Sequence, residues 1–337
     1  GIVIIISGAL VAGHFIWQNS IYFTVTFENV NGVTYTYDDL TVKKGEDFTF
    51  DISLQEKFAF YDDLFAVTVN GEKIEKTNNH YEIKNVGKNL NIFVWGVGSQ
   101  NLTITNKTLT GATDIDEDLY IPYGVEAIAD DSFQSESALK NAAIPDSVKI
   151  IGARAFSDCG NLAAIEIGGN VERIGQSAFF QTAWFDNHAN GTVYLGNWLY
   201  AFKGFSDSKN FIIKEGTVGV AEYAFAGLGN IETVELPGTL KYICAYAFGD
   251  IRLKEINLPD GLKYIGNFAF VHIDITELII PQSVEEIAAN AFVACYYLKT
   301  VRIESVATFG DRVFTACTAL ESVNFANGAK NISVEMF

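Results

Sequence analysis

The side chains best suited to catalysis or metal binding are scattered along this sequence. None of the four histidines, His14, His80, His188 and His272, has a partner at metal-ligand spacing. The chain contains no G-x-S-x-G nucleophile motif, no G-x-x-x-x-G-K-[ST] phosphate loop and no G-x-G-x-x-G turn before a helix. Carboxylates are abundant, but a sequence cannot show whether two of them assemble at a glycosidase separation. We therefore expect a protein that is not an enzyme and that uses no cofactor or metal.

Aromatic side chains offer the clearest chemistry for binding. The Trp and Tyr residues of residues 182–210 are Trp184, Tyr194, Trp198 and Tyr200. The turn signals Asn190-Gly191 and Gly196-Asn197 predict a projecting hairpin in this segment. Because Trp and Tyr supply large amphipathic areas, these rings could contact a protein or stack on a sugar. They could equally cover a gap between two structural units.

The charge of the chain narrows the class of partner. A formal net charge of -18 disfavours nucleic acid and anionic lipid, which are bound by clustered Lys and Arg. A charged partner is therefore expected to be basic, although acidity also keeps a surface protein soluble. Asp114, Asp116, Glu117 and Asp118 form an acidic cluster. Because no loop glycine or complete ligand set accompanies it, a solvated linker is favoured over a calcium site.

The four cysteines are placed as structural residues. Cys159, Cys295 and Cys317 each follow a phenylalanine by three residues, which predicts a column of small apolar side chains. Cys244 occupies a different position, which is filled elsewhere by Gly152, Gly175 and Gly266. We expect free thiols. A bridge between Cys295 and Cys317 is the one pairing that stacked units would allow.

The elements that position these side chains come from a repeat. Residues 275–297, ITELIIPQSVEEIAANAFVACYY, follow the pattern L-x-x-I-x-I-P-x-x-V-x-x-I-G/A-x-x-A-F-x-x-C, and residues 253–274 and 231–252 align with it. The period is 22 or 23 residues, and all five prolines stand at one phase: Pro122, Pro145, Pro237, Pro259 and Pro281. This pattern predicts a leucine-rich-repeat solenoid. Each unit should contain a short strand, a turn at the proline, a second extended segment and a helical turn carrying A-F.

The repeat also identifies core and surface positions. Its marker phenylalanines are Phe133, Phe156, Phe179, Phe225, Phe248, Phe270, Phe292 and Phe314, with one doubled interval between Phe179 and Phe225. We expect Phe248, Phe270 and Phe292 to form a buried stacked column. The middle residues of the L-x-L segments should face solvent: Ala143, Glu166, Ile212, Glu235, Asn257, Ile279, Arg302 and Asn324. No chemistry recurs among them, which argues against a repetitive ligand. We take Ile212, Ile279 and Arg302 as candidate contact residues.

The N-terminal third has a different pattern. Residues 1–19 begin with an uncharged apolar run, which predicts the end of a signal peptide, a membrane anchor, or a buried first element. Residues 20–98 alternate Thr with Val and aromatic residues in short runs divided by Asn-Gly and Lys-Gly turns. This favours a small immunoglobulin-like β-sandwich. Residues 99–118 are expected to form a linker and a cap for the solenoid.

These motifs resemble a known family. The unit I-P-x-x-V-x-x-I-x-x-x-A-F-x-x-C, from Leu119 to Phe337, resembles the repeat of BspA-like leucine-rich-repeat proteins of bacterial cell surfaces, and TAWFDNHANGTVYLGNWLYAFKG resembles an element of the same family. The segments KKGEDFTFDISL, VTVNGEKI and YEIKNV resemble β-domains that accompany these repeats. The resemblance implies a secreted or surface-anchored protein that binds host or neighbouring-cell proteins. It implies no site residues, because the motif describes core positions.

The sequence therefore predicts an α+β, mostly β, chain with four parts. These are a hydrophobic segment (1–19), an immunoglobulin-like β-sandwich (20–98), a linker or cap (99–118) and a repeat domain (119–337) with an insertion at 182–210. The predicted function is adhesion to a protein partner outside the cell. We expect no binding to nucleic acid, and a link to the membrane only through residues 1–19. The alternative is a carbohydrate-binding module that uses the aromatic insertion.

Overall fold

The computed structural model describes residues 22–325 except 29, 77–79 and 100, and also the backbone of two short strands nearer the N-terminus. These strands, β1 (Leu10–Val11) and β2 (His14–Phe15), pair antiparallel. The rest of the predicted signal or anchor segment, residues 1–19, lies outside the described residues. Within the described part of the chain, no helix has the length and apolar character needed to cross a membrane.

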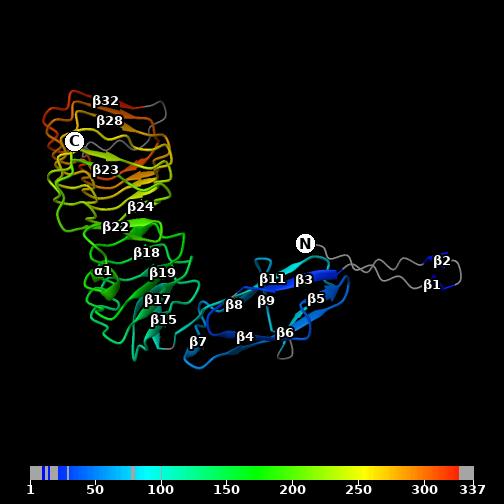
Figure 1. The fold of residues 1–337 in the computed structure, drawn as a ribbon. Coiled ribbons are helices and arrows are strands. Elements are labelled where there is room, and N and C mark those ends of the chain that lie inside the picture. Colours follow the sequence, from blue (N-terminus) through cyan, green and yellow to red (C-terminus); the bar gives the residue numbers. More distant parts are fainter. Residues whose placement is uncertain are drawn as a thin grey trace. The chain divides into compact units, whose positions relative to one another are not determined.

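The chain forms two compact units (Figure 1). The first contains residues 1–102 together with Leu119–Val125, and the second contains Thr103–Asp118 together with Glu126–Phe337. Residues 119–125, which the sequence assigns to the repeat domain, thus belong to the first unit by their contacts.

Two sheets form the main part of the first unit. One has the strand order β5-β3-β11-β8-β9 and the other the order β10-β6-β4, while β7 and β12 form a separate antiparallel pair. The strands are β3 (Tyr22–Phe27), β4 (Val33–Tyr37), β5 (Thr41–Lys43), β6 (Phe48–Leu54), β7 (Phe58–Phe60), β8 (Ala66–Val69), β9 (Glu72–Ile74), β10 (Tyr81–Ile83), β11 (Leu90–Trp95) and β12 (Val97–Ser99).

The alternating residues of these strands build one core. Val25 and Ile92 from the five-stranded sheet share a buried cluster with Phe50 from the three-stranded sheet. Period-two alternation places every second side chain on the same face, so the two inner faces meet. The strands β3 and β11 pair in parallel, whereas the other pairings that involve these two sheets are antiparallel. The immunoglobulin-like assignment remains a prediction.

The second unit is a solenoid with two columns of strands, seen as stacked coils in Figure 1. We call the first the V-x-x-I column. Its strands are β14 (Thr108–Ala112), β16 (Ala127–Ile128), β18 (Ile150–Ile151), β20 (Arg173–Ile174), β22 (Trp198–Lys203), β24 (Gly219–Val220), β26 (Tyr242–Ile243), β27 (Tyr264–Ile265), β29 (Glu286–Ile287) and β31 (Thr308–Phe309). At the start of this column β14 pairs in parallel with β16, and the assignment of residues 99–118 as a linker and cap remains a prediction.

We call the second the L-x-L column. Its strands are β17 (Asn141–Ile144), β19 (Ala164–Ile167), β23 (Asn210–Ile212), β25 (Thr233–Glu235), β28 (Glu277–Ile280), β30 (Thr300–Ile303) and β32 (Ser322–Phe325). Successive strands pair in parallel within the groups β17-β19, β23-β25 and β28-β30-β32. The remaining elements of the repeat region are β13 (Leu102–Thr105), β15 (Asp118–Tyr120), α1 (Ala183–Asp186) and β21 (Gly191–Leu195).

A column of phenylalanines fills the solenoid. Phe248, Phe270 and Phe292 are fully buried, and their rings stack with centroid separations of 5.4 and 5.1 Å. The predicted column is confirmed. It consists of two stacks, Phe133 to Phe179 and Phe225 to Phe314, because the insertion interrupts it.

The predicted helical turn at A-F is wrong. In each unit the residue two positions before the column phenylalanine has a positive φ: Asp131, Arg154, Ser177, Tyr223, Tyr246, Phe268, Asn290 and Arg312. A left-handed residue at this point breaks a helical path. It turns backbone groups toward the neighbouring coil, where Phe270 N–H donates to the Ala291 carbonyl at 2.9 Å. Hydrogen bonds between coils therefore replace those of a helix.

All four cysteines are buried free thiols, as expected. Cys159 Sγ donates to the Phe133 carbonyl at 3.0 Å, and Cys295 Sγ and Cys317 Sγ make the equivalent bond at 3.2 Å to Phe270 and Phe292. Burial raises the pKa of the Cys159 thiol to about 11. Each thiol therefore satisfies a carbonyl of an earlier coil.

Close packing between coils explains the glycine of the repeat. A Cβ on Gly266 would lie 2.6 Å from the Ala245 nitrogen, and one on Gly152 would lie 2.5 Å from the Asp130 nitrogen. We expect Gly266→Ala to lower the free energy of unfolding by about 1–3 kcal/mol, because the obstructing atoms are backbone. The matched control is Gly238→Ala, whose Cβ meets nothing within 4 Å. Equal urea midpoints for the two variants would contradict this prediction.

Candidate functional site

The L-x-L column presents the predicted contact residues Ile212, Ile279 and Arg302. Ile212 on β23 is 73% exposed and Ile279 on β28 is 50% exposed, while Leu278 and Ile280 beside the latter are buried. In register, Ile279 lies opposite Arg302 of β30, whose guanidinium pairs with Glu304. Ile279 and Arg302 are therefore neighbours. Ile212 pairs instead with Glu235 of β25, in a separate strand group.

The aromatic insertion forms a hairpin but does not project. Its strands β21 and β22 pair antiparallel across the Gly196-Asn197 turn, as predicted. On its other edge β22 pairs in parallel with β24, with Leu199 opposite Val220. The prediction of a projecting hairpin is wrong, because the buried side chains of β22 hold it in the V-x-x-I column.

Two of the four predicted ring contacts lie in the interior. Trp198 is 0% exposed and Tyr200 is 5% exposed, so neither ring is available to a ligand. The Tyr200 hydroxyl accepts a hydrogen bond from Phe179 N–H at 2.8 Å, and burial raises the pKa of this phenol well above its usual value. Trp198 lies over Gly219, where a Cβ would come within 2.4 Å of the indole. These two rings therefore fill the gap between neighbouring coils of the solenoid, which is the second of the two interpretations of the aromatic insertion.

The other two rings are half-buried. Trp184 on α1 makes edge contacts with Phe179 and Tyr200, at centroid separations of 5.9 and 5.5 Å. Tyr194 on β21 accepts a hydrogen bond from Lys214 N–H at 3.1 Å, and Lys214 Nζ lies over its ring. Both rings pack against residues that flank the insertion, and each leaves only part of its surface for a partner.

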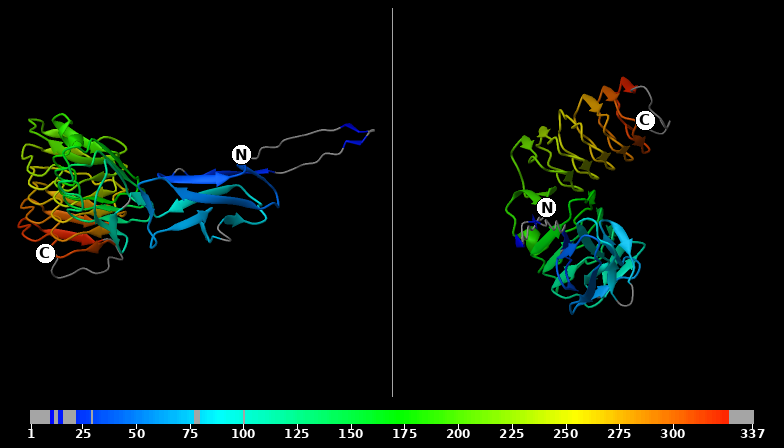
Figure 2. Two further views of the ribbon diagram at one scale, coloured as in Figure 1. Left: turned by 90° about the horizontal axis from the view of Figure 1, so that it is seen from below. Right: turned by 90° about the vertical axis from the view of Figure 1, so that its right-hand side faces the viewer.

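The V-x-x-I column is broken at the insertion. The strand β20 ends one sheet, and β24 belongs to the next. Glu222 spans the break, because its N–H donates to the Ile174 carbonyl at 3.1 Å and its carboxylate accepts from Gln176 N–H at 3.0 Å. The coils change direction here, as the right-hand view of Figure 2 shows. We call this place the elbow, with an N-terminal arm that ends at Phe179 and a C-terminal arm that begins at Ile212.

Cys244 belongs to the elbow. It stands at the repeat position that Gly152 and Gly175 fill in other coils. Its buried thiol is directed to the Ile174 carbonyl of the other arm. Burial raises the pKa of this thiol to about 12. The unusual cysteine in the glycine slot thus marks the point where the stack is interrupted.

A pocket lies at the elbow, with a volume of about 240 Å³. We call it the elbow pocket, and its lining residues are Ile150, Glu172, Arg173, Tyr242, Lys263, Tyr264, Glu285 and Glu286. Both arms contribute: Arg173 of β20 places its guanidinium 5.2 Å from the ring centre of Tyr264 on β27. Lys263 Nζ forms an ion pair with Glu285 at 2.9 Å. Burial raises the pKa of Tyr264 and of Glu222 beside it.

Sequence reasoning missed the elbow pocket. Ile150 and Arg173 are register neighbours in the N-terminal arm, and Tyr242, Tyr264 and Glu286 are register neighbours in the C-terminal arm. The repeat does not show that these two groups line one pocket at the elbow. The doubled repeat interval and Cys244 in the glycine slot are the two signals that could have located it.

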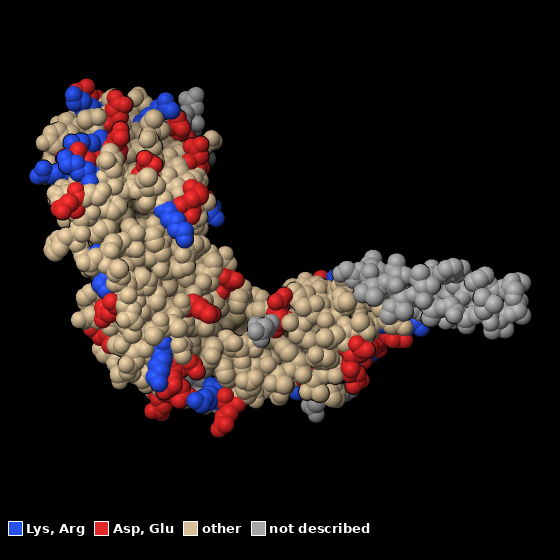
Figure 3. All heavy atoms as spheres, viewed as in Figure 1, with Lys and Arg blue, Asp and Glu red and all other residues tan. Residues whose placement is uncertain are grey.

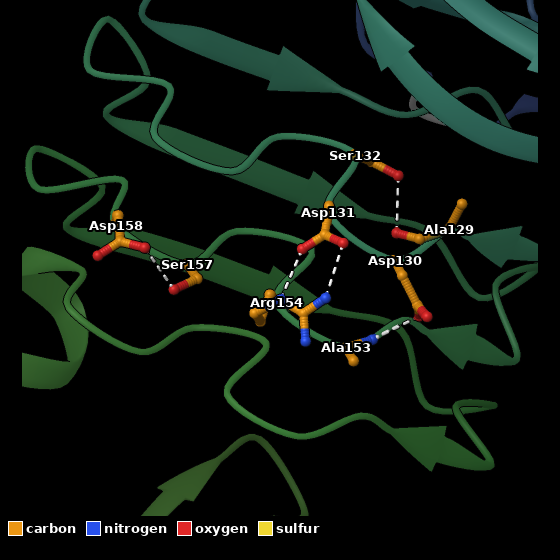
Figure 4. A network of polar contacts seen from close by, with 8 residues as sticks. All are labelled: Ala129, Asp130, Asp131, Ser132, Ala153, Arg154, Ser157 and Asp158. Atoms are coloured by element: carbon orange, nitrogen blue, oxygen red, sulfur yellow. Dashed lines mark hydrogen bonds and ion pairs between the residues drawn. The ribbon is translucent and has the colours of Figure 1, made fainter.

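Polar contacts also join neighbouring coils elsewhere on the solenoid. In the N-terminal arm, Arg154 donates two hydrogen bonds to Asp131 at 2.7 and 2.8 Å, and Ala153 N–H donates to Asp130 at 2.8 Å (Figure 4). In the C-terminal arm, hydrogen bonds from Lys209 and Lys254 lower the pKa of Glu232 to about 2. Acidic and basic side chains are accordingly interspersed on the visible face of the solenoid (Figure 3).

His80, His188 and His272 each interact with different partners. His80 pairs with Asp51 at 2.9 Å, His272 pairs with Asp250 at 2.7 Å, and His188 Nδ1 lies 2.7 Å from the Trp184 carbonyl. Among the residues described by the structure, no group of three or more His, Cys, Asp and Glu side chains is arranged to hold a metal ion.

Stacked coils of 22 or 23 residues with parallel strand columns define a leucine-rich-repeat solenoid. The sequence matches the family described as BspA type leucine rich repeat region over residues 102–216 and 218–337, with six copies, and the chain belongs to this family.

Several solved structures are similar to this chain. A leucine-rich repeat protein from Bacteroides ovatus is 23% identical, with 68% of this chain and 69% of that chain covered and a TM-score of 0.32. The pneumococcal vaccine antigen PcpA is 17% identical, with 73% and 78% covered and a TM-score of 0.40. A leucine rich cell surface protein from Faecalibacterium prausnitzii is 22% identical, with 67% and 74% covered and a TM-score of 0.26. No curated protein sequence matches the chain.

Proposed function

We propose that this protein is a non-enzymatic recognition protein of the bacterial cell surface or extracellular space, which binds a protein partner through its repeat surface. Membership of the BspA-type repeat family supports this proposal. The observation that carries it is the exposure of Ile212 and Ile279 on the L-x-L column, where the alternating pattern directs side chains to solvent. Exposed aliphatic side chains on a rigid strand face suit a protein surface better than a soluble polymer.

The organisation of the rest of the chain fits this role. We propose that residues 20–98 form an immunoglobulin-like spacer, that residues 99–118 form the linker and cap, and that residues from 119 onward carry recognition. Residues 1–19 would then direct the chain out of the cell or anchor it. The carbohydrate-binding alternative loses its main support, because Trp198 and Tyr200 are buried.

Substitutions on the L-x-L column test the proposal. The full chain is assayed by surface plasmon resonance against a panel of extracellular-matrix and cell-surface proteins. We expect the double variant Ile212→Asp/Ile279→Asp to weaken binding at least tenfold, because it places two charges in an apolar contact. The matched control is Val306→Asp, since Val306 is 66% exposed and lies outside the strands of this column. Binding that survives the double substitution would contradict the proposed surface.

A further inference from the structure

We propose that the elbow pocket is a second recognition site, which takes one lysine or arginine side chain from a peptide. The site lies on the V-x-x-I column and is independent of Ile212 and Ile279 on the L-x-L column. Four observations support the inference. The pocket has carboxylates without partners among the described residues, its own Lys and Arg already interact with neighbouring residues, tyrosine rings form its walls, and its volume suits one side chain.

The free hydrogen-bonding groups of the pocket include two carboxylates. Glu172 on the N-terminal arm and Glu286 on the C-terminal arm are exposed, and within the described part of the chain neither carboxylate has a hydrogen bond or an ion pair. An ionised carboxylate only accepts hydrogen bonds, so it seeks a donor. Charge-assisted bonds from an ammonium or guanidinium are the strong form of this interaction.

The cations of the pocket are already held by neighbouring groups. Lys263 pairs with Glu285, and the Arg173 guanidinium lies over the face of Tyr264. The lining therefore contains three carboxylates and two cations, in a chain of net charge -18. An anionic ligand would meet Glu172, Glu285 and Glu286, whereas a cation would meet unpaired acceptors.

Tyr242 and Tyr264 supply walls for the rest of the side chain. Tyrosine rings attract a cation within about 6 Å of the ring centre and also cover the aliphatic stem of Lys or Arg. Arg173 over Tyr264 shows this contact with a guanidinium of the chain itself. A space of about 240 Å³ suits one long side chain and excludes a folded domain.

The test uses the full chain and three peptides that differ in one side chain. The first is acetyl-Gly-Ser-Lys-Ser-Gly-amide, and the second has norleucine in place of lysine, which keeps the aliphatic stem and removes the charge. Saturation-transfer NMR titrations at low salt should show binding of the lysine peptide at least tenfold tighter than that of the norleucine peptide. A third peptide with glutamate at the same position should bind no more tightly than norleucine.

Variants assign the binding to the pocket. We expect Glu172→Gln/Glu286→Gln to reduce binding of the lysine peptide at least tenfold. The control is Glu56→Gln/Glu215→Gln, which removes the same charge from exposed positions in turns outside both columns and should leave binding unchanged. Equal binding of the lysine and norleucine peptides, tighter binding of the glutamate peptide, or an equal loss in both double variants would each overturn the proposal. None of these results would alter the Ile212 and Ile279 test.

Discussion

Replacing Phe270 by alanine is expected to lower the free energy of unfolding of the solenoid by about 3–5 kcal/mol. The ring is fully buried and is stacked on both faces, 5.4 Å from Phe248 and 5.1 Å from Phe292. Truncation removes apolar burial and leaves a cavity between coils that cannot collapse, because interstrand bonds fix their spacing. Each coil buries its core against its neighbours, so the damage extends to both sides.

The measurement for Phe270 is urea unfolding of the full chain, followed by circular dichroism. Phe205→Ala is the control: Phe205 is 98% exposed, and its loss should change stability by no more than about 0.5 kcal/mol. A loss below about 1 kcal/mol for Phe270→Ala would contradict the stacked column as the main support of the fold.

Replacing Trp198 by alanine is expected to have a comparable effect, about 3–5 kcal/mol, and to act at the elbow. The indole is fully buried over Gly219 and stacks with Tyr242 at 6.1 Å. Its removal would leave a void beside β24, next to the break in the V-x-x-I column. Because Tyr242 lines the elbow pocket, we expect peptide binding there to weaken as well.

The variant Trp198→Phe tests how much of the stability depends on the apolar volume of the ring. Among the described residues, the buried indole Nε1 of Trp198 has no hydrogen-bond partner, so its removal should not break a bond. We expect this variant to cost less than half as much as Trp198→Ala in thermal and urea unfolding. Equal losses for the two variants would show that the apolar bulk of the ring does not support the elbow.

The repeat period allowed much of the solenoid to be predicted, because local packing rules operate in every coil. The recurring phenylalanines indicated the buried column, and the residue between two apolar positions of a strand indicated the exposed Ile279. Cys159, Cys295 and Cys317 were recognised as core because they share one phase. In the first unit, alternation was enough to predict strands such as β4 and β6.

The parts that could not be predicted depend on backbone conformation and on contacts distant in sequence. A positive φ at Tyr246 or Phe268 is unusual for an aromatic residue, so the sequence predicts a helical turn at A-F that the structure does not form. The sequence leaves Trp198 either in a contact surface or in the gap between coils, because nothing in it shows that β22 pairs with β24. The elbow pocket joins Arg173 to Tyr264 across the insertion, and no repeat pattern encodes such a contact.

The central claim is that the chain binds a protein partner with the L-x-L column. The most direct test is hydrogen–deuterium exchange of the full chain with and without a partner identified by the binding panel. We predict slower exchange in peptides that contain β23, β28 and β30, with the remaining coils unchanged. Protection confined to the first unit, or to the turns that carry the column phenylalanines, would contradict the claim.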